Sequence, residues 1–369
     1  MDLNFSDERV NTGRQVELDI AKGMAIVFMV FMYSIMVVSL FPNSLSEGYT
    51  FVFSNLLGRL GAAPVIMFCM GVGMVYSTKS SSERMIRRGI NLMILGVLVN
   101  LLQFFLPCLV TGILLGEWTI FPIAKGLMLF RVDFLAFAGM TFILMGFAQR
   151  LDLTSGALIT FALFFSVVGS TLRFSDLNYS ILNLIAGYFI GTEGGFTSFP
   201  LFTWFIIPAV GYAWGDYYSK VKSKDDFFRF WPVLLIVSMA YFLCTLFFKN
   251  GFLSDLPHYC FMTTLDAVPC LVFAYGIIGL YYHISKVLPD PVLKLFELLS
   301  TKITTIYVAL WALIPLGPAF AKFFMKDLVF GELATTVIAL GGLCVAVLIA
   351  VLDKNRKRRS QRRSRRHRR

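Results

Sequence analysis

Charged side chains are scarce in this sequence. Only 15% of its 369 residues are Asp, Glu, Lys or Arg, whereas ordinary soluble domains have about 25%. Hydrophobic residues make up 57% of the chain, so a soluble fold would have too few polar groups to cover its surface. Apolar runs of ~20 residues recur along the whole length, and each could cross a hydrocarbon core of roughly 30 Å. The composition therefore excludes an ordinary soluble enzyme and predicts an integral membrane protein.

Cysteine pairs and histidines are also few. The six cysteines form no CxxC pair and no metal-ligand spacing, and most lie inside apolar runs, where Cys behaves as a small hydrophobe. We therefore expect no disulfide framework and no metal site. No cleavable signal is predicted, because about twenty polar and charged residues precede a first apolar run that is too long for a signal peptide.

The predicted fold class is all-α, a polytopic membrane protein with about ten transmembrane helices. Helices are required because a bilayer offers no partner for free backbone groups, and the short alternating segments of a β-barrel are missing. Segment 1–22 precedes a transmembrane domain over 23–352, and a polybasic tail over 353–369 is expected to be disordered. The predicted spans are 23–42, 51–77, 89–107, 126–148, 155–172, 198–216, 231–248, 259–283, 300–320 and 333–352.

Two apolar stretches interrupted by Gly and Pro leave alternatives open. Residues 108–125 and 181–200 could each be a re-entrant segment, an interfacial segment or an imperfect span. Irregular backbone at membrane depth survives only where protein covers it or where it lines a cavity.

The distribution of Lys and Arg predicts the orientation. If the N-terminus is cytoplasmic, 25 of the 33 basic residues fall in cytoplasmic segments. We therefore expect a protein of the cell membrane with both termini on the cytoplasmic side. Eleven of them lie in the last sixteen residues, Lys354 to Arg369. This run directly follows an apolar span, which favours contact with anionic lipid headgroups over nucleic acid.

Five polar residues fall in one predicted outer layer of the membrane: Arg59, Arg131, Asp133, His258 and Asp266. Ionisable residues inside spans are costly and are therefore candidates for function. One interpretation is a polar cavity that binds a hydroxylated or anionic acceptor, with His258 as a general base. The alternative is a pair of structural ion pairs, such as Arg131 with Asp266 or Arg59 with Asp133.

Basic residues also flank two spans on the predicted inner side. The positive-inside rule alone accounts for them, but they could also bind the phosphates of a coenzyme A donor through charge-assisted hydrogen bonds. The candidates for such a donor site are Arg14, Asp19, Lys22, Arg84, Arg87 and Arg88.

The entry to the first span carries the most specific motif. Residues 14–26, RQVELDIAKGMAI, resemble the RxxxLDxx(R/K)Gxxx motif of the transmembrane acyltransferase superfamily. This superfamily includes the acyltransferase-3 and heparan-α-glucosaminide N-acetyltransferase families. Weaker similarities follow in order at 57–77, 84–96, 127–139 and 199–215.

The resemblance implies an acyl-CoA-dependent enzyme without a metal. Such enzymes move an acyl group, usually acetyl, from a cytoplasmic donor such as acetyl-CoA to an extracytoplasmic glycan. Membrane lipid and a glycan acceptor are the partners it implies, and a homodimer is a further candidate.

The chain departs from the superfamily at the expected catalytic histidine. The acyltransferase-3 branch has a His in the middle of its first span, where this chain has Tyr33, and the loop after that span contains no His. Tyr33, His258 and Asp266 are therefore the predicted catalytic residues. A transporter or flippase of a polar or lipid-linked sugar, and a relative that has lost the chemistry, are the alternatives.

Overall fold

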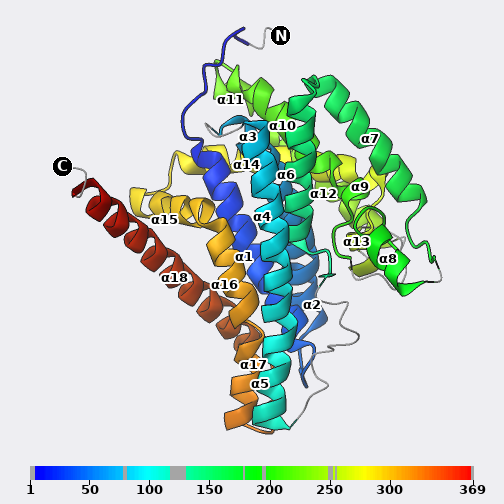
Figure 1. The fold of residues 1–369 in the computed structure, drawn as a ribbon, viewed down its shortest axis with the longest axis vertical. Coiled ribbons are helices and arrows are strands. Elements are labelled where there is room, and N and C mark those ends of the chain that lie inside the picture. The colour runs from blue at the N-terminus through cyan, green and yellow to red at the C-terminus, as the bar shows by residue number, and fades with distance from the viewer. Residues whose placement is uncertain are drawn as a thin grey trace.

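The computed structural model describes residues 5–77, 81–116, 130–177, 179–192, 197–247, 252–253 and 256–366, which form a bundle of helices (Figure 1). Within these ranges, seven helical segments are long and apolar enough to cross a membrane. The prediction of an all-α polytopic membrane protein is confirmed. The seven segments are α1 (Val16–Val38), α2–η1–α3 (Glu47–Val75), α4–η2–α5 (Ser82–Leu115), α11–α12 (Lys224–Leu246), α14 (Thr264–Ser285), α16–α17 (Ile303–Phe324) and the first part of α18 (Glu332–Arg356).

Shorter helices complete the described bundle, and each of the ten predicted spans overlaps one of the helical segments. Two of the shorter helices, α6 and α7, are apolar along their lengths. The bounds of the shorter helices are Phe134–Arg150 for α6, Ser155–Thr171 for α7, Ser180–Gly187 for α8, Leu201–Trp204 for α9, Ile206–Ser219 for α10, Lys224–Phe227 for α11, Trp231–Phe247 for α12, Leu256–Cys260 for α13 and Asp290–Thr301 for α15.

Two long segments contain π-helical turns. In the second segment, η1 (Phe51–Leu60) ends before α3 (Ala63–Val75), whose second residue, Pro64, has no N–H for the preceding turn. In the third, η2 (Leu101–Phe105) separates α4 from α5. Such turns occur frequently at functional sites, and both lie next to a cavity described below.

The irregular stretch 108–125 is partly resolved by this helix. Residues up to Leu115 belong to α5 (Leu106–Leu115), which continues the span and ends at Gly116, whose φ of 71° favours glycine. Residues 117–125 lie outside the described residues. In the stretch 181–200, α8 extends to Gly187, and residues 193–196 are likewise outside the described part.

Helices α4 (Ser82–Asn100) and α6 pack closely because glycines face each other. A Cβ added to Gly89 would lie 2.5 Å from the carbonyl oxygen of Gly139, a distance that real side chains do not tolerate. This approach brings the basic first turns of α4 against the α6 face that carries Phe142.

The last helices run obliquely to the bundle. Figure 1 shows α15 lying across the axis of α1 and α18 leaving the bundle at a steep angle. Helix α18 (Glu332–Arg366) extends through most of the tail, which we expected to be disordered. No Gly or Pro follows Gly342, and Arg, Lys and Gln are good helix formers, so the apolar span continues as one helix.

Candidate functional site

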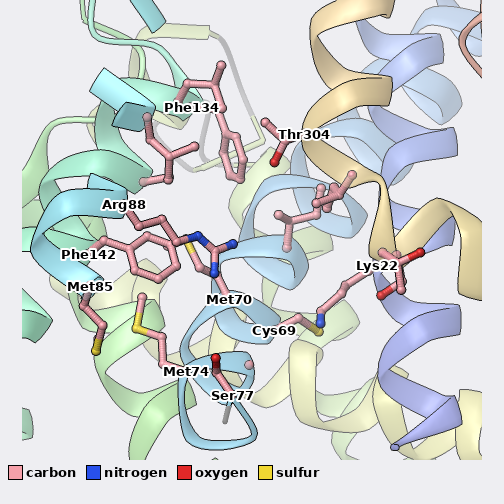
Figure 2. Close-up of a pocket in the computed structure, with 18 of the residues that line it drawn as sticks. Lys22, Cys69, Met70, Met74, Ser77, Met85, Arg88, Phe134, Phe142 and Thr304 are labelled. Carbon is pink, nitrogen blue, oxygen red and sulfur yellow. The ribbon is translucent and has the colours of Figure 1, made fainter. Parts of the chain in front are cut away.

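A cavity of about 470 Å³ lies near the beginning of α1, between α3, α4, α6 and the start of α16. We call it the basic cavity, because Lys22, Arg84 and Arg88 line it and no Asp or Glu is among its described lining residues. Figure 2 shows Lys22 and Arg88 pointing into it from opposite sides, with Phe134 at one end and Ser77 at the other. Hydroxyls and sulfurs interrupt its apolar wall, contributed by Ser77, Ser300, Thr301, Thr304, Cys69, Met70, Met74 and Met85.

The three cations of the basic cavity form no ion pair with a carboxylate in the described part of the chain. Arg88 places its guanidinium 4.4 Å from the centre of the Phe142 ring, a cation–π contact. Arg84 donates to the Ser81 hydroxyl over 2.8 Å. Three positive charges, with no carboxylate among the described lining residues, create a positive potential in the cavity that would favour an anion.

The other three predicted donor-binding residues are placed differently. Arg14 bridges two carboxylates, at 2.6 Å to Asp19 and 2.9 Å to Glu297 of α15. Arg87 is exposed on α4 and is not among the described residues lining the basic cavity, and neither are Arg14 and Asp19. Arg14 and Asp19 thus join the first helix to α15, while Lys22 alone of this motif reaches the cavity.

A second, smaller cavity of about 60 Å³ lies further along α1. We call it the Asp133 cavity, because Asp133 is the only carboxylate among its described lining residues. Tyr33, Gln103 of η2 and Arg131 also line it, and most of the remaining wall is apolar. Of the three predicted catalytic residues, Tyr33 lines this cavity, while His258 and Asp266 are not among its described lining residues.

Asp133 is held by three hydrogen bonds to uncharged groups. As the N-cap of α6, it accepts the backbone N–H of Phe134 on Oδ1 over 2.8 Å. Its Oδ2 accepts the Tyr307 hydroxyl at 3.0 Å and the Trp311 indole N–H at 3.1 Å. The Trp311 ring stacks between Tyr33 and Tyr307, with both centroid distances 4.2 Å. The carboxylate is therefore fixed at the edge of a rigid aromatic stack.

Arg131 is tied to the loop before α9. Its Nη2 donates to the Ser198 hydroxyl over 2.7 Å, and its carbonyl oxygen accepts from Asn100 over 2.9 Å. An isolated backbone bridge between Val132 and Thr197 fastens the same segments. These contacts fix the chain immediately before Asp133.

The remaining residues of the predicted outer layer do not line the Asp133 cavity. Asp266 is the third residue of a capping box with Thr263, and it also accepts the Tyr241 hydroxyl over 3.0 Å. Arg59 donates to the Leu253 carbonyl over 3.1 Å. His258 packs its ring edge-on against Phe174, with centroids 5.7 Å apart.

The two ion pairs that we considered from the sequence are not formed. The carboxylates of Asp133 and Asp266 both bind neutral donors, and Arg131 binds a hydroxyl. The carboxylates of Asp133 and Asp266 are thus satisfied by polar neutral groups, which avoids the need to bring two ions together in a low dielectric.

The basic cavity and the Asp133 cavity meet at two residues. Ile66 of α3 and Phe134 of α6 line both of them. Along α1, Lys22 and Tyr33 mark the two cavities, and eleven residues of helix separate them by about 16 Å.

Comparison with known protein families supplies the decisive observation. The family model of the heparan-α-glucosaminide N-acetyltransferase catalytic domain matches residues 14–254, well over half of the chain. The chain belongs to this family. Searches of curated proteins and of solved structures gave no match.

Membership agrees with the resemblance found at the first span. The family is one of multi-pass membrane acetyltransferases that use acetyl-CoA as the donor. The matched segment includes Lys22, Arg84, Arg88, Arg131 and Asp133, which border the two cavities.

Sequence reasoning missed the aromatic partners of Asp133. Tyr307 and Trp311 lie beyond the matched segment, and a Tyr and a Trp four residues apart face the same side of a helix. The polar tips of buried aromatic residues need hydrogen-bond partners, so this pair was a signal that a polar group lies nearby.

Proposed function

We propose that this protein transfers an acetyl group from cytoplasmic acetyl-CoA to an amine or hydroxyl of a glycan on the opposite side of the cell membrane. The observation that carries the proposal is the junction of the two cavities. An anion site without carboxylates abuts, at Ile66 and Phe134, a small cavity containing one carboxylate.

The basic cavity suits the donor. Lys22, Arg84 and Arg88 would bind its phosphates through charge-assisted hydrogen bonds. The apolar and sulfur-containing wall between them and Phe134 would contact the pantetheine arm. That arm is long enough to bridge the distance from Lys22 to the level of Tyr33, which brings the thioester to the Asp133 cavity.

Asp133 is the group best placed to accept a proton. In a direct transfer, the acceptor nitrogen or oxygen attacks the thioester carbonyl, a C–N or C–O bond forms, and the C–S bond breaks. Asp133 takes the proton released by the acceptor, and coenzyme A leaves with the sulfur. Tyr307 and Trp311 keep the carboxylate in one orientation. Tyr33, whose ring stacks on Trp311, is a second candidate in the same cavity.

The family description names a glucosaminide, so an amino sugar is the first acceptor to test. Purified protein in detergent should bind acetyl-CoA in a calorimetric titration, and coenzyme A should compete with it. Adding a terminal α-glucosaminide oligosaccharide should then release free coenzyme A and give an acetylated sugar. If acetyl-CoA does not bind at all, the proposal is wrong, and a transporter of the sugar becomes the better explanation.

A further inference from the structure

Helices α3 and α6 each contribute to the walls of both cavities. On α3, Ala62 and Ala63 line only the Asp133 cavity, Cys69 and Met70 line only the basic cavity, and Ile66 lines both. The wall of α3 therefore changes from one cavity to the other at a single residue.

Helix α6 repeats this arrangement. Asp133 lines only the Asp133 cavity, Leu135 and Ala138 line only the basic cavity, and Phe134 lines both. The Phe134 ring is held in place, with its centroid 5.7 Å from that of Tyr307 and 6.5 Å from that of Phe199. Only 3% of the surface of Ile66 is exposed. Two fixed bulky side chains thus stand between the cavities.

The space beyond them is small. The Asp133 cavity measures about 60 Å³. Each water-sized group needs roughly 10–15 Å³ of such volume, so the cavity holds only a few heavy atoms. An acetyl group, with three heavy atoms, fits with room to spare, a butyryl group would about fill the cavity, and a whole sugar ring does not fit. The acceptor would therefore present only its reacting atom to this cavity.

We infer that Ile66 and Phe134 form a constriction that sets the length of the acyl group this protein accepts, and that the Asp133 cavity is the acyl-binding pocket. The inference rests on the proposed function, because it presumes an acyl-CoA in the basic cavity. It gives Ile66 and Phe134 the role of discriminating acetyl-CoA, the donor of the family, from longer donors such as butyryl-CoA.

The test compares two donors in each variant. The affinities of acetyl-CoA and butyryl-CoA are measured by calorimetry on the full chain in detergent, and their ratio is reported. A partly misfolded sample lowers the measured stoichiometry for both donors equally, so the ratio remains interpretable. No acceptor is needed.

In the wild type, butyryl-CoA should bind no more tightly than acetyl-CoA. In Ile66→Ala, the two extra methylenes gain apolar space, and each is worth about fourfold in affinity, so the ratio should shift toward butyryl-CoA by about tenfold. Phe134→Leu, a gentler change, should shift it in the same direction. Leu92→Ala removes the same volume at a residue that lines the basic cavity and is not among the described lining residues of the Asp133 cavity, and should leave the ratio unchanged.

Three results would overturn the inference. Ratios in Ile66→Ala and Phe134→Leu equal to the wild-type ratio would show that these residues do not limit the acyl chain. An equal shift in Leu92→Ala would show that any added space has the same effect. Tighter binding of butyryl-CoA than of acetyl-CoA by the wild type would show that Ile66 and Phe134 do not restrict the length of the acyl group. Failure of the wild type to bind either donor contradicts the proposed function first, and that outcome is distinct from the other three.

Discussion

The charged residues around the basic cavity and those around the Asp133 cavity are satisfied in opposite ways. Lys22 and Arg88 line the basic cavity without a carboxylate partner in the described part of the chain, whereas Asp133 accepts three hydrogen bonds from uncharged groups, as Asp266 does outside the Asp133 cavity. Cations that line a cavity without a carboxylate partner favour an anionic ligand there. Satisfied charge indicates either a positioned reacting group or a structural cap, and only the surroundings distinguish them.

The largest effect is expected in a test of which side of the membrane the basic cavity faces. A cysteine replacing Ser46, in the loop after α1, should react with a membrane-impermeant maleimide in intact cells, and one replacing Ser223, before α11, should react only after lysis. The native cysteines are labelled in parallel as background. Labelling of the Ser223→Cys protein from outside would invert the comparison, with the basic cavity facing away from cytoplasmic acetyl-CoA.

Substitution of the two carboxylates, Asp133 and Asp266, should affect different properties of the protein. Asp133→Asn keeps an N-cap residue but cannot accept a proton, so transfer should fall by a factor of about 10²–10⁴ while acetyl-CoA affinity is nearly retained. Asp266→Asn should instead lower the melting temperature, because it weakens the capping box with Thr263. Comparable loss of transfer in both variants, after correction for the folded fraction, would mean that Asp133 is also only structural.

Two adjacent arginines on α4 provide a matched pair for the basic cavity. Arg88→Gln removes a charge that faces the cavity and should weaken acetyl-CoA binding by about 1.5–3 kcal/mol. Arg87→Gln removes the same charge one residue earlier, outside the lining, and should have little effect on affinity. If the two variants bind equally well, the positive-inside rule alone explains these residues.

The aromatic support of Asp133 should have a smaller effect. Trp311→Phe keeps a ring between Tyr33 and Tyr307 but removes the N–H that Asp133 accepts. Loss of one hydrogen bond of about 0.5–1.5 kcal/mol predicts an about two- to thirteenfold slower transfer, measured as release of coenzyme A. Unchanged transfer, with an unchanged melting temperature, would show that Tyr307 and the α6 N-terminus hold the carboxylate without help.

The smallest effect is expected at His258. Because its ring packs on Phe174 and does not line the Asp133 cavity, His258→Ala should leave both donor affinity and transfer rate unchanged. A loss of about a hundredfold or more would restore His258 as the general base and would require the cavity to rearrange when the acceptor binds.

Many features were predictable because they depend on local composition. The helical segments follow from apolar length, since a bilayer leaves backbone groups no other partner. Their places next to predicted spans identified Lys22, Arg84 and Arg88 as candidates. Depth within the predicted span 126–148 identified Arg131 and Asp133. Side-chain direction could not be predicted from such local patterns. Arg87 and Arg88 are neighbours in sequence, yet the rotation of about 100° per helical residue sends only one of them into the cavity.

The sequence by itself determined the fold class, the membrane setting and the family, because each depends on hydrophobic length and on a contiguous motif. Tertiary structure alone decided which polar residues share a cavity. Tyr33, Asp133 and Trp311 come from three separate helices, and their meeting depends on packing between spans that no local pattern encodes. It also decided that Asp133, the N-cap of α6, lines a cavity, whereas Asp266, in the capping box of α14, is not among the described lining residues of either cavity. Both carboxylates lie near the start of a helix, and they differ only in what the neighbouring helices place beside them.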